Sequence, residues 1–208
     1  MIYDKNLGAY TMEKSYSREY RLMERRIEFL GNTLIKDFMD KDAIKLSKKE
    51  IELARSYRLL VHAELEDYFE SIAKKLLLKA KDKWTKYKKP NLTTLALFAH
   101  SKYIEKGTTS TKVNKIIIDF KSEVIDQNHG IKEKNIEKMF IPLGVDKDNI
   151  DVALLSTLDT FGAKRGETAH RSGKVQQPID LRTEVGNVNF IVNSIKEFED
   201  SISNILKS

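Results

Sequence analysis

The chain has 208 residues and no cysteine, which excludes disulfide bonds, thiolate chemistry and zinc sites built on cysteine. Its 37 Lys and Arg against 31 Asp and Glu give a net charge of +6, which suits a polyanionic partner and equally suits a lysine-rich solvated surface. Apolar runs are only a few residues long and no signal peptide is visible, so we expect a cytoplasmic protein without a membrane segment.

Helical periodicity dominates the sequence, which contains only 3 prolines and 9 glycines. There is no alternation of strands and helices, no glycine-rich nucleotide loop and no internal repeat. We therefore predict an all-α fold, a helical bundle with long antiparallel helices that forms a single domain over residues 1–208. Within it we distinguish an N-terminal helical arm, residues 1–45, from a helical body, residues 46–208.

The two longest predicted helices come first along the chain. The first covers residues 15–40, with apolar side chains at four-three spacing from Tyr16 to Leu34 that form a coiled-coil-like seam. The second begins at Ser47, where Glu50 completes a capping box, and continues to about residue 83. We expect the two helices to pack as an antiparallel hairpin. Any part of the first seam left uncovered is then available to a second copy or to a partner protein.

A basic stretch with two aromatic residues, KAKDKWTKYKK, ends the second helix. Trp84 and Tyr87 alternate there with lysines, and this combination can stack on and clamp single-stranded RNA. The alternative is a solvated helix end whose tryptophan packs on the core.

Shorter helices are predicted after Pro90, where Gly and Pro residues separate apolar-periodic segments. The cluster of Asp146, Asp148 and Asp151 fits a loop and a helix N-cap better than a metal site. No paired His–carboxylate ligand set is present, so we expect no metal and no other cofactor. The predicted segments are 91–105, 111–127, 132–140, 148–165 and 178–206.

Three polar residues of the second predicted helix lie in or beside its apolar stripe. At 100° per residue, Arg58 and His62 are about 40° apart within that stripe, and Glu66 lies at its edge. Polar groups in such positions cost free energy unless they are paired. They either form a buried network between helices or face a polar cleft, and the two roles are compatible.

The string RGETAH, residues 165–170, places an arginine five positions before a histidine. Arginine is a permanent phosphate clamp, and histidine exchanges protons near neutral pH. Arg165 shares a helix face with Phe161, so it points inward, whereas His170 lies about 140° away on a regular helix. The two converge if the helix breaks at Gly166 or if a second protomer completes the site. The alternative is that Arg165 caps the helix and His170 is an incidental surface residue.

The Arg-x4-His string and the segment VHAELEDYFE resemble HEPN-domain ribonucleases, in particular the RiboL-PSP-HEPN branch. The resemblance covers the chain from about Ser47 onward. It implies an all-α fold, homodimerisation, metal-independent endoribonuclease activity and a role in bacterial toxin–antitoxin or antiphage systems, with an antitoxin or another defence protein as a partner. Arg165 and His170 become the catalytic pair. The predicted supporting residues are Arg58, His62, Glu66 and Glu167, and the predicted RNA contacts are Lys164, Arg171, Lys174 and Trp84.

The chemistry expected of this pair uses the RNA's own 2′-OH as nucleophile. His170 takes or gives the proton and Arg165 stabilises the phosphate charge, which yields a 2′,3′-cyclic phosphate and a 5′-OH end. DNA lacks the 2′-OH and is not cut. This chain has Gly166 where the family often has a polar residue, so the alternative is a non-catalytic helical module that binds RNA or a protein partner.

Overall fold

The computed structural model describes residues 16–101, 107–170 and 178–207, with the side chain of His170 outside the description. Seven α-helices, a π-helical turn and short 3₁₀ turns make up this part of the chain, and it contains no strand. The predicted all-α class is therefore confirmed. None of the described helices is long and apolar enough to cross a membrane.

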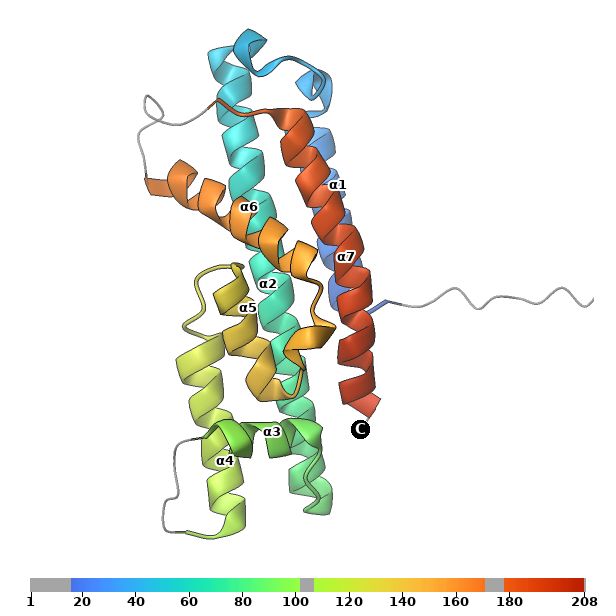
Figure 1. Cartoon of the computed structure of the whole chain (residues 1–208), viewed down its shortest axis with the longest axis vertical. Coiled ribbons are helices and arrows are strands. Elements are labelled where there is room, and N and C mark those ends of the chain that lie inside the picture. The colour runs from blue at the N-terminus through green and yellow to red at the C-terminus, as the bar shows by residue number, and fades with distance from the viewer. Residues whose placement is uncertain (1–15, 102–106, 171–177, 208) are drawn as a thin grey trace, which may run out of the picture.

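Three long helices form the main body, and the longest of them, α2 (Lys48–Tyr87), runs along most of the molecule (Figure 1). Helix α1 (Arg18–Leu34) packs antiparallel to α2. Glu19 forms an ion pair with Lys75, and Arg26, later in α1, pairs with Glu64, earlier in α2. Helix α7 (Leu181–Lys207) runs parallel to α2 beside α1. The predicted hairpin of the first two helices is present.

The start of α2 follows the predicted capping box. The Ser47 hydroxyl accepts from the Glu50 amide at 3.3 Å, and the Ser47 amide donates to the Glu50 carboxylate at 2.8 Å. These two bonds satisfy amides that a helix start leaves without partners. The helix continues past residue 83 and ends at Tyr87, one residue before Lys88 takes a left-handed conformation.

The apolar seam of α1 is covered within the chain, so the condition for a partner on this seam, an uncovered part of it, is not met by its buried members. Its buried members Tyr20, Met23, Ile27 and Leu30 belong to the same core as α2 and α7. The amide and hydroxyl of Ser17, the N-cap of α1, both donate to the Glu199 carboxylate of α7 at 2.7 Å. Helix α1 is also shorter than predicted, because the chain turns into two 3₁₀ segments, Lys36–Phe38 and Ala43–Lys45.

The second half of α2 is covered by shorter helices (Figure 1). These are α3 (Leu92–His100), α4 (Thr109–Phe120) with a π-helical turn at Lys121–Ile125, and α5 (Glu133–Phe140). Two 3₁₀ turns, Ile141–Leu143 and Lys147–Asn149, lead on toward the next helix.

Trp84 lies among these packed elements with only 8% of its surface exposed. A covered indole cannot stack on an RNA base, so the predicted RNA contact of Trp84 is wrong and the alternative, packing on the core, holds. Trp84 is also 22 residues beyond His62 on α2, roughly 33 Å along the helix axis.

Helix α6 (Val152–His170) carries the Arg-x4-His string and runs obliquely across α2 (Figure 1). The Asp151 carboxylate accepts from the amides of Ala153 and Leu154 and so caps the helix, which begins at Val152 and not at residue 148 as predicted. Helical backbone continues through Gly166 to His170, and the break considered at Gly166 does not occur. The string therefore sits on the last turns of a regular helix.

Candidate functional site

Arg58 is a buried arginine that joins three helices. Its Nε donates to Oε1 of Glu184 at 2.6 Å, and its Nη2 donates to Oε2 of the same carboxylate at 3.0 Å. Its Nη1 donates to the Thr168 hydroxyl at 3.0 Å. The side chain of Arg58 thus links α2 to the last turn of α6 and the first turn of α7.

Glu184 is the central anion of this arrangement and was missed by the sequence analysis. It is 1% exposed and takes both hydrogen bonds of the Arg58 fork, while the Lys164 ammonium lies 3.7 Å from its Oε2. A signal was available, because Glu184 falls at helical spacing between the apolar residues Leu181 and Val188 of α7. An acidic residue within an apolar stripe indicates a buried cationic partner.

His62 lies one turn after Arg58 on the same face of α2 and is 2% exposed. Its ring is nearly parallel to that of Phe161, with centroids 6.5 Å apart. Its Nδ1 is 3.6 Å from the Glu66 carboxylate, too far for a hydrogen bond, and has no other partner among the described residues. Burial, helped by the positive charge of Arg165, lowers the pKa of His62 to about 4, so its imidazole is neutral at pH 7.

Glu66 lies one turn after His62 on α2 and is partly buried. Burial raises its pKa, and the nearby charge of Glu70 raises it further. The positive charges of Arg165 and His129 act in the opposite direction without cancelling these effects. His129, in the segment before α5, is therefore a second basic group near Glu66 that sequence periodicity did not indicate, because it lies outside a helix.

Arg165 points inward, as its place on the Phe161 face predicts, and is half-buried. Its Nε is enclosed and has no hydrogen-bond acceptor among the described residues, and no carboxylate in that part of the chain forms an ion pair with it. Its charge nevertheless acts on His62 and Glu66. Only the Nε is enclosed and the side chain as a whole is half-buried, so the guanidinium can still pair with an anion that arrives from outside.

The structure brings most of the predicted site residues together but does not describe all of them. Arg58, Lys164 and Glu167 border a cavity of about 200 Å³ with Glu184. Arg171 and Lys174 and the side chain of His170 lie outside the described residues, so their predicted roles remain predictions. The described residues hold no group of His, Asp and Glu side chains able to bind a metal ion.

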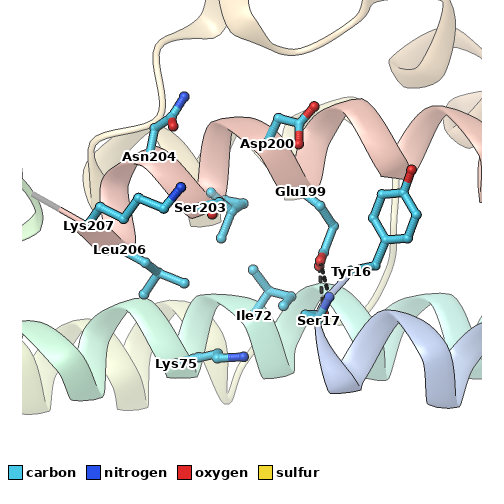
Figure 2. Close-up of a pocket in the computed structure, with 11 residues that line it drawn as sticks. Tyr16, Ser17, Ile72, Lys75, Glu199, Asp200, Ser203, Asn204, Leu206 and Lys207 are labelled. Atoms are coloured by element: carbon cyan, nitrogen blue, oxygen red, sulfur yellow. Dashed lines mark hydrogen bonds between the residues drawn. The ribbon is translucent and has the colours of Figure 1, made fainter. Parts of the chain in front are cut away.

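A larger cavity, of about 590 Å³, lies at the other end of α7 and contains none of the predicted site residues. Figure 2 shows Glu199 bonded there to Ser17, with Ile72 and Lys75 on the facing helix. The Glu199 carboxylate also accepts from the buried Tyr68 hydroxyl at 2.8 Å. These bonds fasten α1 to α2 and α7. The carboxylate at this cavity is therefore already paired and has a structural role.

No curated protein and no solved structure matches the chain. The family model described as RiboL-PSP-HEPN matches residues 21–204. This match begins inside α1, well before Ser47, and so includes most of the segment predicted as a separate N-terminal arm.

Proposed function

Since the chain belongs to the RiboL-PSP-HEPN family, we propose that it is a metal-independent endoribonuclease. The observation that carries this proposal is Arg165, a half-buried guanidinium with no anionic partner among the described residues, set within the helical string that also holds His170. The phosphate of a bound RNA supplies the missing anion. Arginine is well matched to phosphate because its planar fork donates two parallel hydrogen bonds.

The reaction follows from the chemistry of RNA. The 2′-oxygen attacks the adjacent phosphorus as its proton leaves, the bond from phosphorus to the 5′-oxygen breaks, and that oxygen takes a proton. Arg165 stabilises the additional negative charge on the phosphate oxygens in the transition state. The products are a 2′,3′-cyclic phosphate and a 5′-OH end.

We assign the proton transfers to His170 rather than to His62. The imidazole of His62 is buried against Phe161, and its pKa of about 4 makes it a poor base and an unprotonated group at pH 7. His62 is suited instead to form part of the wall against which Arg165 lies, since a neutral ring does not repel the guanidinium.

A homodimer is part of the proposal. On a regular helix, residues five positions apart point about 140° away from each other, and α6 is regular from Arg165 to His170. A second copy related by a two-fold axis can present the complementary residue to each cleft. Sedimentation at micromolar concentration tests this, with twice the 24.0 kDa chain mass expected. Mixing protomers that carry Arg165→Ala with protomers that carry His170→Ala then tests whether the clefts share residues.

The cellular role proposed is that of a toxin or antiphage-defence effector. Uncontrolled RNA cleavage arrests growth, so induced expression in a bacterial host is expected to be toxic. An inactive variant expressed to the same level serves as the control, and growth arrest by both would contradict a role through RNA cleavage. An antitoxin or another defence protein remains the proposed partner.

The decisive experiment for the activity uses purified protein and RNA in EDTA. Wild type is expected to cleave RNA but not DNA of the same sequence, and to leave 5′-OH and cyclic phosphate ends. His170→Ala, purified identically, controls for contaminating nucleases. Cleavage that EDTA abolishes, or 5′-phosphate ends, would contradict the mechanism. RNA binding without any cleavage would favour the alternative of a non-catalytic module.

A further inference from the structure

The contacts of Arg58 form a clamp, which we define as Arg58, Glu184, Thr168 and Lys164. Arg58 is 7% exposed and uses Nε, Nη1 and Nη2 for three hydrogen bonds of 2.6 to 3.0 Å, two to Glu184 and one to Thr168. Bidentate pairs of this type fix orientation as well as distance. The clamp therefore determines how the ends of α6 and α7 sit against α2.

The clamp is connected to the candidate site through Thr168, which lies within the Arg-x4-His string of α6. Thr168 is three residues after Arg165 and two before His170, on the last turn of a 19-residue helix. Helix ends fray readily when they lack tertiary contacts, and the catalytic string occupies such an end. The bond from Arg58 to the Thr168 hydroxyl holds this turn against α2.

The clamp also arranges the charges of the cleft. Glu184 pairs with Arg58 through two hydrogen bonds and lies 3.7 Å from the Lys164 ammonium, so it offsets two cations at once. Arg165 is left as the neighbouring cation without an ion pair among the described residues. Arg165 is therefore the cation of this group whose charge is not offset by Glu184.

We propose that the clamp is a positioning device, in which Thr168 holds the turn of α6 that carries the catalytic string and Glu184 neutralises competing cations so that phosphate binds at Arg165. The proposal rests on the proposed ribonuclease function. Arg58, Thr168 and Glu184 act through Arg165 and the end of α6 and do not touch the reacting atoms.

The first test is a matched pair of substitutions at half-buried Thr168. Thr168→Val keeps the branched shape and removes the hydroxyl, whereas Thr168→Ser keeps the hydroxyl. We expect Thr168→Val to lower kcat about tenfold with KM nearly unchanged, because small misplacements of catalytic groups have effects of up to about 100-fold. Hydrogen exchange of the amides at residues 166–170 is expected to accelerate in Thr168→Val and not in Thr168→Ser.

The second test separates positioning from general stability through Glu184→Gln. This change frees the charges of Arg58 and Lys164 for phosphate. We expect a short RNA with 2′-O-methyl groups, which lacks the nucleophile, to bind about two- to fivefold more tightly, the change expected for roughly 0.5–1 kcal/mol of extra attraction. Cleavage of ordinary RNA is expected to slow at the same time. A residue that merely stabilised the fold would weaken both or change neither, and either result would overturn the charge-neutralising role.

The outcomes distinguish this proposal from the proposed function. If wild type cleaves RNA and Thr168→Val cleaves equally well, the ribonuclease assignment stands and the clamp is not a positioning device. If wild type does not cleave RNA, only the exchange rates and the binding of the methylated RNA test whether the clamp positions the end of α6. Equal exchange at the end of α6 in wild type, Thr168→Val and Thr168→Ser would then overturn the proposal. If Glu184→Gln fails to fold, the Thr168 pair carries the test.

Discussion

Two arginines of neighbouring helices, Arg58 on α2 and Arg165 on α6, have opposite surroundings. Arg58 on α2 is buried and its fork is filled by Glu184 and Thr168. Arg165 on α6 is half-buried, and its enclosed Nε has no acceptor among the described residues. A satisfied buried arginine holds helices together, whereas an unsatisfied one is free to receive a ligand. The comparison separates residues that build the cleft from the residue proposed to act in it.

The largest expected effect is on stability and comes from the satisfied arginine. Arg58→Ala leaves the carboxylate of Glu184 buried without its bidentate partner and is expected to lower the free energy of unfolding by about 3–5 kcal/mol. Urea unfolding followed by circular dichroism measures the change. A loss smaller than about 1 kcal/mol, the size typical of an exposed ion pair, would show that the pair does not fasten the helices.

The next effect concerns His62 and depends on pH. Its pKa in the folded chain, about 4, is below its ordinary 6.5, so the unfolded chain binds the proton first as pH falls. The contribution of neutral His62 to the free energy of unfolding is therefore complete above pH 6.5. It is lost as the pH falls from 6.5 to 4. The Tm of wild type is expected to fall more over this pH range than the Tm of His62→Gln. Parallel pH profiles for the two proteins would contradict the burial of a neutral His62.

The same histidine reports on Arg165. The charge of Arg165 is a smaller cause of the low pKa of His62 than burial is. In Arg165→Gln, the pKa of His62 measured by NMR is expected to rise but to stay below 6.5. An unchanged pKa would place the Arg165 guanidinium away from His62, and a return to 6.5 would mean that burial has little effect.

The smallest expected effect is at Gly166, next to Arg165. The residue is helical, and a Cβ built there meets nothing within 4 Å. Gly166→Ala is therefore expected to stabilise the chain by about 0.5–1 kcal/mol through the backbone entropy of glycine, with cleavage retained. Thermal unfolding measures the gain. A loss of both stability and activity would indicate that the string needs a break at this position.

The sequence predicted the elements of the main body well where local signals were strong. The capping box of Ser47 and Glu50 located the start of α2, and the seam of α1 identified residues that are indeed buried. It did not reveal that α7 packs beside α1 as well, because this depends on contacts such as Ser17 with Glu199, 182 positions apart. The end of α1 was placed too late, since 3₁₀ turns keep a similar apolar spacing.

The candidate site was also predictable only in part, because the sequence shows the faces of each helix and not the partners on other helices. Helical periodicity placed Arg58, His62 and Arg165 on inward faces, and in the structure Arg58 and His62 are buried while the charge of Arg165 acts on His62. Periodicity within one helix does not name a partner on another, so Glu184 was missed although its own stripe offered a hint. The sequence left the role of Trp84 open, because its basic neighbours resemble an RNA-binding segment whether the ring faces solvent or core.

The measurement that tests the central claim most directly combines cleavage and melting of Arg165→Ala. Removing a phosphate clamp is expected to slow single-turnover RNA cleavage in EDTA by about 100- to 1,000-fold. Removing a half-buried cation that has no partner is expected to leave Tm unchanged or slightly higher. Near-wild-type cleavage, or a fall in Tm as large as that of Arg58→Ala, would show that Arg165 is a structural residue like Arg58 and would contradict the account.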